Sequence, residues 1–323
     1  MTGVLARGLA AAMTIFAASQ FAHAQSYPAQ TITIVLPFSA GTGIDTATRV
    51  FAEKLSQRLG QPVIMENRPG AGGNLGHGAV AKSSPDGYTL LMAANTLAMN
   101  SSLYNLPFDP ATSFAPVGLY VKGGMALIVH EKVQAKTVDE LIALAKADPG
   151  KLNYSTPGIG TPQHLAMELL KRSTGIDIVH IPAKGAAEAV RDVVRGELEA
   201  MFVPVQSIIP QIKQGAVRAL AVSGSKRHPA LPDTPTIAEA TKNSDFDVDL
   251  WYGLFVPAGT PQPIVDKLNG EIRAILELPD VQERIGKLGM ARNPSSANEL
   301  GDLYRTDAAR WARLIKDANI KPQ

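Results

Sequence analysis

The chain has 323 residues, of which 45% are hydrophobic and 19% charged, so it is long enough for about two domains of roughly 100–200 residues each. A formal net charge of +2, with no block of like charges, argues against nucleic acid as a partner. The absence of cysteine excludes disulfides, thiol catalysis, thiolate metal sites and a lipid-modified cysteine.

The N-terminus has the pattern of a secretory signal peptide over residues 1–24. Arg7 precedes the apolar run Leu9–Ala18, and Ala22-His23-Ala24 has the small residues that signal peptidase requires. The apolar run is shorter than the roughly 20 residues that span a membrane. We therefore expect a mature protein that begins near Gln25 and is exported to the periplasm without a lipid anchor.

The residues after the leader alternate between apolar strands and amphipathic helices. This alternation predicts parallel strands in a doubly wound sheet. In chain order, the first part gives a strand at 31–38, a loop at 39–43, a helix at 44–59, a strand at 63–66, a helix at 74–82 and a strand at 88–93.

The middle of the chain repeats the pattern and predicts a second α/β lobe. Its strands are expected at 126–129, 152–155, 178–181, 200–205 and 218–223, and its helices at 138–147, 162–172 and 186–195. Residues 226–236 have the composition of a connector. Residues 251–257 then predict a strand that returns to the first lobe, followed by helices at 263–276, 281–288 and 297–318.

A secreted α/β protein can equally be a hydrolase, and a hydrolase would carry catalytic motifs. The chain has no Gly-x-Ser-x-Gly elbow and no His-Glu-x-x-His, and no two histidines are four residues apart. Ser223 and Lys226 match Ser-x-x-Lys, but the companion motifs are missing. The sequence therefore predicts neither an enzyme nor a metal site, and it implies no cofactor.

The glycine-rich segment 70–78 includes a relaxed match to the dinucleotide-binding motif at Gly76–Ala81. That motif belongs in the turn directly after a strand, whereas here Asn67–Gly70 intervenes and Asn74 already begins a predicted helix. We expect a tight turn with a close helix approach instead.

Three segments at predicted strand ends have the features of anion-binding loops, because helix N-termini offer unpaired N–H groups and a positive dipole end. The first is Pro37–Asp45, where Thr42 and Asp45 have capping-box spacing and Gly41 and Gly43 permit close backbone approach. An ordinary capped helix is the alternative. Asp45 could cap, orient a ligand-bound water or repel a carboxylate.

The second segment is Ser155–His164, with Thr161 suited to the N-cap and Pro162 to the first helical position. The third is Ala94–Thr96, at the carboxyl edge of the first sheet, where open α/β sheets bind ligands. His164 could donate to an anion or simply cap and pack. The roles of Lys184 and Trp251 are equally open. Either could contact the ligand, but Lys184 could also be a solvated lysine and Trp251 a core indole.

Several motifs together resemble the substrate-binding proteins of tripartite tricarboxylate transporters, also called Bug receptors. The resemblance covers essentially all of the mature chain. It is carried by Tyr27-Pro28, Pro37–Asp45, Glu66–Gly73, Pro85–Leu90, Ala143–Leu152, His164-Leu165, His180–Pro182, Lys184-Gly185, Arg218–Val222, Pro235–Glu239 and Trp251–Leu254.

This resemblance implies a type II periplasmic-binding fold, with two α/β lobes joined by two crossovers around a ligand cleft. Lobe 1 is expected to comprise residues 25–122 and 245–323, and lobe 2 residues 123–244. The expected ligand-contacting residues lie in and beside the loops described above: Phe38, Ser39, Ala40, Gly41, Thr42, Gly43, Asp45, Ala94, Asn95, Thr96, Ser155, Thr156, Pro157, Gly160, Thr161, His164, Ala183, Lys184 and Val203.

Three departures from the family pattern bear on the ligand. Thr42 replaces a glycine and adds a hydroxyl, Ala183 stands where the family usually has tyrosine, and Val203 where it often has aspartate. The last two changes make that side of the cleft roomier or less polar, if they lie in the cleft. They favour a bulky or aromatic carboxylate over a small amino acid.

The sequence therefore predicts a monomeric periplasmic protein that captures a di- or tricarboxylate, or an aromatic carboxylate, and delivers it to a membrane permease with one large and one small integral subunit. Two alternatives stay open: a periplasmic sensor subunit and a secreted α/β hydrolase.

Overall fold

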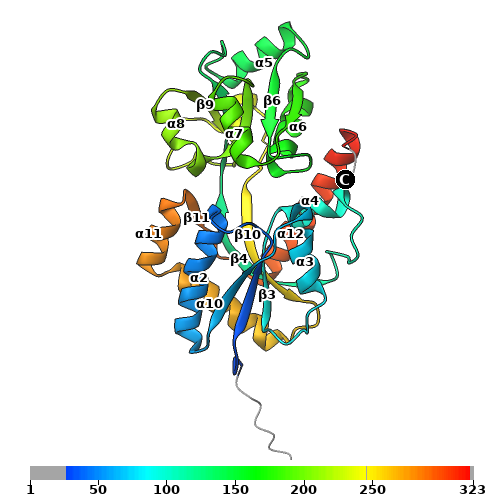
Figure 1. Ribbon diagram of the computed structural model, residues 1–323, viewed down its shortest axis with the longest axis vertical. Helices are drawn as coiled ribbons and strands as arrows, with labels where there is room; N and C mark the ends of the chain where they lie inside the picture. The colour runs from blue at the N-terminus through cyan, green and yellow to red at the C-terminus, as the bar shows by residue number, and fades with distance from the viewer. Residues whose placement is uncertain (1–26, 245, 321–323) are drawn as a thin grey trace, which may run out of the picture.

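The computed structural model describes residues 27–244 and 246–320. The predicted signal peptide lies outside these residues. The described chain forms two lobes, each built on one β-sheet with helices on its faces (Figure 1). Among the described residues, no helix is both long and apolar enough to cross a membrane.

Lobe 1 contains a six-stranded sheet in the order β11-β4-β10-β3-β1-β2. Strands β1, β2 and β3 are mutually parallel, whereas β10 runs antiparallel to both β3 and β4. The strands are β1 (Ile32–Leu36), β2 (Val63–Asn67), β3 (Thr89–Ala94), β4 (Phe114–Gly123), β10 (Leu250–Pro257) and β11 (Met290–Arg292).

Lobe 2 contains a five-stranded sheet in the order β7-β6-β8-β5-β9. Strands β6, β7 and β8 are parallel, and β5 is antiparallel to both of its neighbours. The strands are β5 (Met125–His130), β6 (Asn153–Thr156), β7 (Val179–Pro182), β8 (Ala200–Pro204) and β9 (Val217–Val222). Both sheets are thus mixed and not wholly parallel, because the strands that pass between the lobes enter each sheet against the direction of a neighbour.

Several helices begin at a residue whose side chain caps them. The side chains of Thr137, Thr161, Thr236 and Ser296 each accept a hydrogen bond from a first-turn N–H. Lobe 1 holds α2 (Gly43–Leu59), η1 (Ala71–Gly73), α3 (Asn74–Ala81), α4 (Thr96–Leu103), α10 (Gln262–Leu276), α11 (Pro279–Lys287) and α12 (Ala297–Asp317). Lobe 2 holds α5 (Val138–Ala147), α6 (Pro162–Thr174), α7 (Ala186–Val194), η2 (Val205–Ser207), α8 (Ile209–Lys213) and α9 (Ile237–Thr241).

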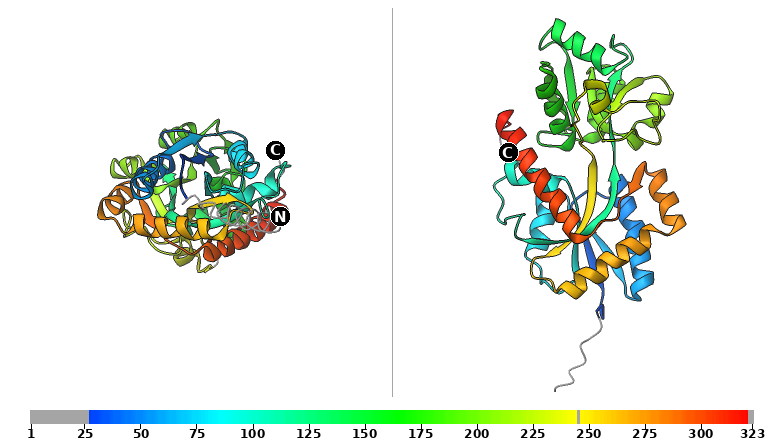
Figure 2. Two further views of the ribbon diagram at one scale, coloured as in Figure 1. Left: turned by 90° about the horizontal axis from the view of Figure 1, so that it is seen from below. Right: turned by 180° about the vertical axis from the view of Figure 1, so that it is seen from behind.

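The hinge consists of two neighbouring crossovers, which Figure 2 shows from behind. Strand β4 runs almost directly into β5, with Gly124 between them, and the chain returns between β9 and β10. Ser223 ties the crossovers together, because its Oγ accepts from Met125 N at 3.0 Å and donates to Val248 O at 2.9 Å. Ser223 is therefore a fully buried hydroxyl with a structural role.

The glycine-rich segment makes the close approach expected of it. A Cβ on Gly76 of α3 would lie 2.9 Å from Pro37 Cβ and 3.0 Å from Arg68 O. The glycine thus lets α3 pack against the turn after β1, which brings that turn to a fixed position at the edge of the sheet.

Candidate ligand-binding cleft

The turn between β1 and α2 is held by the buried carboxylate of Asp45. Its Oδ2 accepts from Gly41 N at 2.9 Å and Arg49 Nε at 3.0 Å, and its Oδ1 accepts from Asn67 Nδ2 at 2.9 Å and Arg49 Nη2 at 3.1 Å. Burial alone would raise the pKa of Asp45, but these hydrogen bonds outweigh it and hold the pKa below its ordinary value.

This geometry decides between the three roles that the sequence left open for Asp45. A carboxylate has about four acceptor positions, and all four are taken by protein donors. Asp45 therefore braces the turn from behind. Thr42 is the N-cap, since its Oγ1 accepts from Asp45 N at 3.3 Å, which leaves the first-turn N–H groups of Gly43 and Ile44 without an intrahelical partner.

The turn between β6 and α6 is organised in the same way on lobe 2. Thr161 caps α6 by accepting from His164 N at 3.4 Å, and Pro162 has no N–H, so the N–H of Gln163 is left without an intrahelical partner. His164 is buried, and its Nδ1 accepts the N–H of Gly160 at 3.1 Å. It therefore packs behind the turn.

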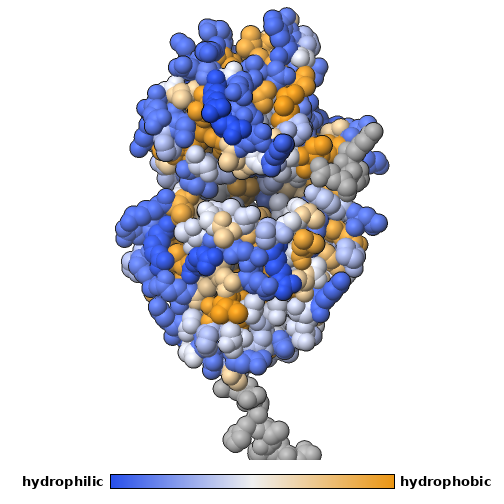
Figure 3. All heavy atoms as spheres, viewed as in Figure 1, coloured by the Kyte–Doolittle hydropathy of each residue, from blue (hydrophilic) through white to orange (hydrophobic). Residues whose placement is uncertain are grey.

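Contacts between the lobes place these two turns on opposite walls of one cleft. A Cβ built on Gly43 would lie 3.5 Å from Gln206 Nε2 of lobe 2, and one on Gly160 would lie 2.6 Å from Leu103 Cδ1 of lobe 1. At the rim, Arg172 of α6 pairs with Asp317 of α12 at 2.9 Å. Figure 3 shows the recess between the lobes at this level.

Four buried polar atoms without a partner belong to residues at or just after the carboxyl ends of β3, β6 and β8. They are Asn95 Oδ1, Thr96 Oγ1, Ser155 Oγ and Gln206 Oε1. Buried polar groups are nearly always paired, so each of these atoms indicates a place where water or a ligand completes the bonding. Gln206 was not predicted from the sequence, because it follows β8 in a stretch without any motif.

The remaining predicted residues lie in different settings. Ala94 is buried, Thr156 is fixed behind its turn, and Phe38, Pro157 and Ala183 are half-buried, while Ser39, Ala40, Gly41 and Thr42 are exposed. Lys184 is exposed, and Trp251 is a core indole. The side chain of Val203 is 1% exposed and packs in an apolar cluster of lobe 2, so its replacement of aspartate does not widen the cleft.

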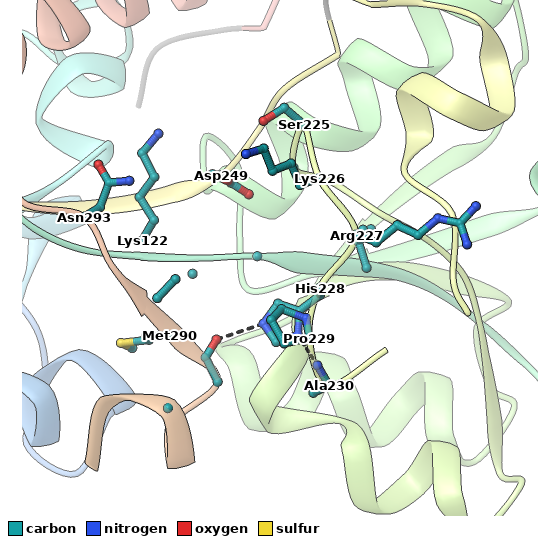
Figure 4. A pocket seen from close by; sticks show the side chains of 17 residues that line it. Lys122, Ser225, Lys226, Arg227, His228, Pro229, Ala230, Asp249, Met290 and Asn293 are labelled. Atoms are coloured by element: carbon teal, nitrogen blue, oxygen red, sulfur yellow. Dashed lines mark hydrogen bonds between the residues drawn. The ribbon is translucent and has the colours of Figure 1, made fainter. Parts of the chain in front are cut away.

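A separate cavity of about 550 Å³ lies on the hinge (Figure 4). Its lining includes Lys122, Lys226, Asp249 and Asn293, and none of the predicted ligand residues. Burial and the neighbouring Asp247 raise the pKa of Asp249 to about 6. Among the residues that the structure describes, no group of three or more His, Asp or Glu side chains is placed to hold a metal ion.

Two α/β lobes, a double crossover and facing helix N-termini define a two-lobed solute-binding protein. Residues 47–320 match the model of the tripartite tricarboxylate transporter family receptor, and the chain belongs to that family. The family consists of solute-binding receptors and not of enzymes.

Similar proteins extend over almost the whole chain. A Pseudomonas protein described as "UPF0065 protein in tcbD-tcbE intergenic region" is 36% identical over 314 residues, covering 97% of this chain and 93% of its own. Two solved Rhodopseudomonas palustris structures are each 31% identical: Rpa4515 with adipate (TM-score 0.81, covering 92% of this chain and 100% of that one) and MatC with bound malate (TM-score 0.77, covering 90% and 100%).

Proposed function

We propose that this protein is a periplasmic receptor that captures a small carboxylate between its lobes and delivers it to a two-component membrane permease. The observation that carries the proposal is the placement of α2 and α6. They begin on opposite walls of the cleft, and their threonine caps leave N–H groups free at Gly43, Ile44 and Gln163.

Such an arrangement binds an anion without a basic side chain. Helix N-termini carry a positive partial charge, and their unpaired N–H groups donate to carboxylate oxygens. Hydroxyls of Thr96 and Ser155 supply further donors at the ends of β3 and β6. Because the donors come from both lobes, a ligand with two acidic groups would bridge the walls and favour closure.

The ligands of the two similar structures, adipate and malate, support a dicarboxylate. Of the two sequence departures that favour a bulky or aromatic acid, only Ala183 still does so, because Val203 is a core residue. Delivery to a permease and a periplasmic location, which membership of this receptor family supports, belong to the proposal, as does a monomeric state.

The test begins with a thermal-shift screen of mono-, di- and tricarboxylates, aromatic acids and matched neutral amides. A ligand at about 100 times its Kd stabilises the folded state by roughly 2.7 kcal/mol, which gives a clear rise in Tm. Only acids should produce it. Equal shifts with the amides would overturn the assignment to carboxylates.

A matched pair of variants at Gly43 tests the role of the helix N-terminus. Proline suits the first helical position, and Thr42 has the extended conformation that proline requires before it, so Gly43→Pro removes one N–H without breaking α2. A hydrogen bond to a charged group contributes about 1.5–3 kcal/mol, so affinity should fall about 10–100-fold. Gly43→Ala keeps the N–H and should retain most of the affinity.

A further inference from the structure

Three aromatic rings form a stack directly behind the turn between β6 and α6. The rings of His164 and His180 are 4.2 Å apart at 25°, and that of Tyr154 lies 4.9 Å from His180 at 22°. They come from α6, β7 and β6.

Both histidines are bonded to the turn. His164 Nδ1 accepts the N–H of Gly160 at 3.1 Å, and His180 Nε2 is 2.6 Å from Thr156 Oγ1. Thr156 Oγ1 in turn bonds both the N–H and the carbonyl of Gly158, at 3.2 and 3.1 Å. The two rings therefore fix the turn 156–161 near both of its ends. Within this turn, Gly160 packs against Leu103 of the opposite lobe.

The bond to Gly160 defines the state of His164. A backbone N–H can only donate, so Nδ1 must be unprotonated and the neutral ring carries its proton on Nε2. The groups that face the stack are Glu168 and Lys171 on α6 and the phenol of Tyr154 on β6. Glu168 Oε1 accepts from Tyr154 Oη at 2.6 Å and from Lys171 Nζ at 2.9 Å, so these charges compensate one another.

Burial lowers the pKa of both histidines to about 4, with the Glu168 carboxylate opposing this for each and Lys171 adding to it. The neighbouring ring of His164 lowers the pKa of His180 further. At neutral pH both rings are therefore uncharged, as the hydrogen bond from Gly160 requires.

We propose that His164 and His180 are positioning residues that hold the turn 156–161 in its ligand-binding form while neutral, and that their protonation releases the turn and the bound acid. The part that concerns the ligand rests on the proposed function. A proton on His164 Nδ1 would point at the N–H of Gly160, and two charged rings 4.2 Å apart would repel each other. Protonation thus breaks a bond to the turn and destabilises the stack.

The first experiment needs no ligand. In the folded protein labelled with nitrogen-15 histidine, NMR should show His164 with its proton on Nε2 at pH 7 and a protonation step well below pH 6.5. The amide of Gly160 should lose its protection from hydrogen exchange in the same step. An Nδ1–H tautomer at pH 7, or protection at Gly160 that persists through the step, would refute the proposal.

The second experiment measures binding of adipate from pH 7 to pH 4 in three proteins. In His164→Asn, Oδ1 can replace Nδ1 as acceptor but does not titrate. It should bind within about threefold of the wild type at pH 7 and lose affinity less steeply on acidification. His164→Ala should bind at least about tenfold more weakly at pH 7. Protonation of adipate affects all three proteins alike, so the difference in slope reports the histidine.

His130→Asn is the matched control. His130 is a buried histidine of the same lobe whose Nδ1 also accepts a backbone N–H, from Lys132 at 3.3 Å, but it lies at the end of β5 and not on the turn. Its variant should follow the wild-type pH profile. Equal slopes for wild type and His164→Asn would contradict the proposal. If the wild type does not bind adipate at pH 7, the choice of adipate as ligand is wrong, and the NMR experiment decides the role of the histidines.

Discussion

Arg49 and Asp45 form a two-point ion pair across one turn of α2, with N–O distances of 3.0 and 3.1 Å. The two partners are unequal, because the Arg49 side chain is 53% exposed and that of Asp45 is 4% exposed. Exposed charges contribute little to stability, whereas a buried acceptor leaves its donors unpaired when it is removed.

This asymmetry predicts different costs for the two alanine variants. Asp45→Ala removes the acceptor of the Gly41 N–H and of one N–H of Asn67 Nδ2, and it should lower the free energy of unfolding by about 2–4 kcal/mol. Arg49→Ala should cost about 1 kcal/mol or less. Urea unfolding measures both. Asp139→Ala, at an exposed aspartate in the first turn of α5, controls for the helix dipole and should also cost about 1 kcal/mol or less.

The two tryptophans of the chain differ in one respect that gives a second prediction. Trp251 Nε1 donates to Asp307 Oδ2 at 2.6 Å, whereas Trp311 Nε1 is buried without a partner. Trp251→Phe therefore strands a buried carboxylate oxygen and should cost about 1–3 kcal/mol more than Trp311→Phe, which removes an unsatisfied donor. Urea unfolding, monitored by circular dichroism, gives the free energy of unfolding of both variants. Equal losses would mean that the Trp251–Asp307 bond adds nothing to stability.

Gly160 gives a third prediction, about the cleft. Its φ of +75° favours glycine, and an added Cβ would lie 2.6 Å from Leu103 Cδ1 across the lobes. Gly160→Ala should therefore weaken ligand binding about tenfold or more, as measured by titration calorimetry. Gly160→Ala combined with Leu103→Ala relieves the clash but not the backbone strain, so affinity should recover in part. If the double variant recovers no affinity, the whole loss in Gly160→Ala comes from backbone strain.

The sequence predicted the elements whose patterns are local. Strand β1, the Thr42 cap and the Thr161-Pro162 start of α6 lie where the spacing placed them. Strand β4 was missed because Pro116 and Gly118 interrupt its pattern. The structure uses that glycine for close packing, since a Cβ there would lie 2.6 Å from Asn269 Nδ2. Helix α4 was missed because it is buried nearly all round and shows no amphipathic period.

Local sequence patterns could not predict the parts of the cleft that depend on contacts between residues distant in the sequence. Asn67 reaches Asp45 only because β1 and β2 pair in a register that sets Leu36 opposite Asn67. The stack of His164 on His180 likewise depends on the packing of α6 against β6 and β7. Spacing could identify Asp45 as a candidate, but its role follows from partners that only the fold brings together.

His77 gives the last prediction, on acid stability. Its side chain is fully buried, Nε2 has no partner, and burial lowers its pKa from 6.5 to about 3. The unfolded chain therefore binds one more proton than the folded chain between about pH 6.5 and pH 3. Stability from this group is complete above pH 6.5 and declines as the pH falls through that window, by about 1.4 kcal/mol per unit.

Replacing the ring removes this dependence. Between pH 7 and pH 5 the wild type should lose about 2 kcal/mol more free energy of unfolding than His77→Leu, as measured by urea unfolding at each pH. His77→Met has a different shape and the same lack of titration, so it should show the same difference even if its stability at pH 7 is not the same. Parallel losses in all three proteins would mean that His77 is protonated in the folded state as readily as in the unfolded one.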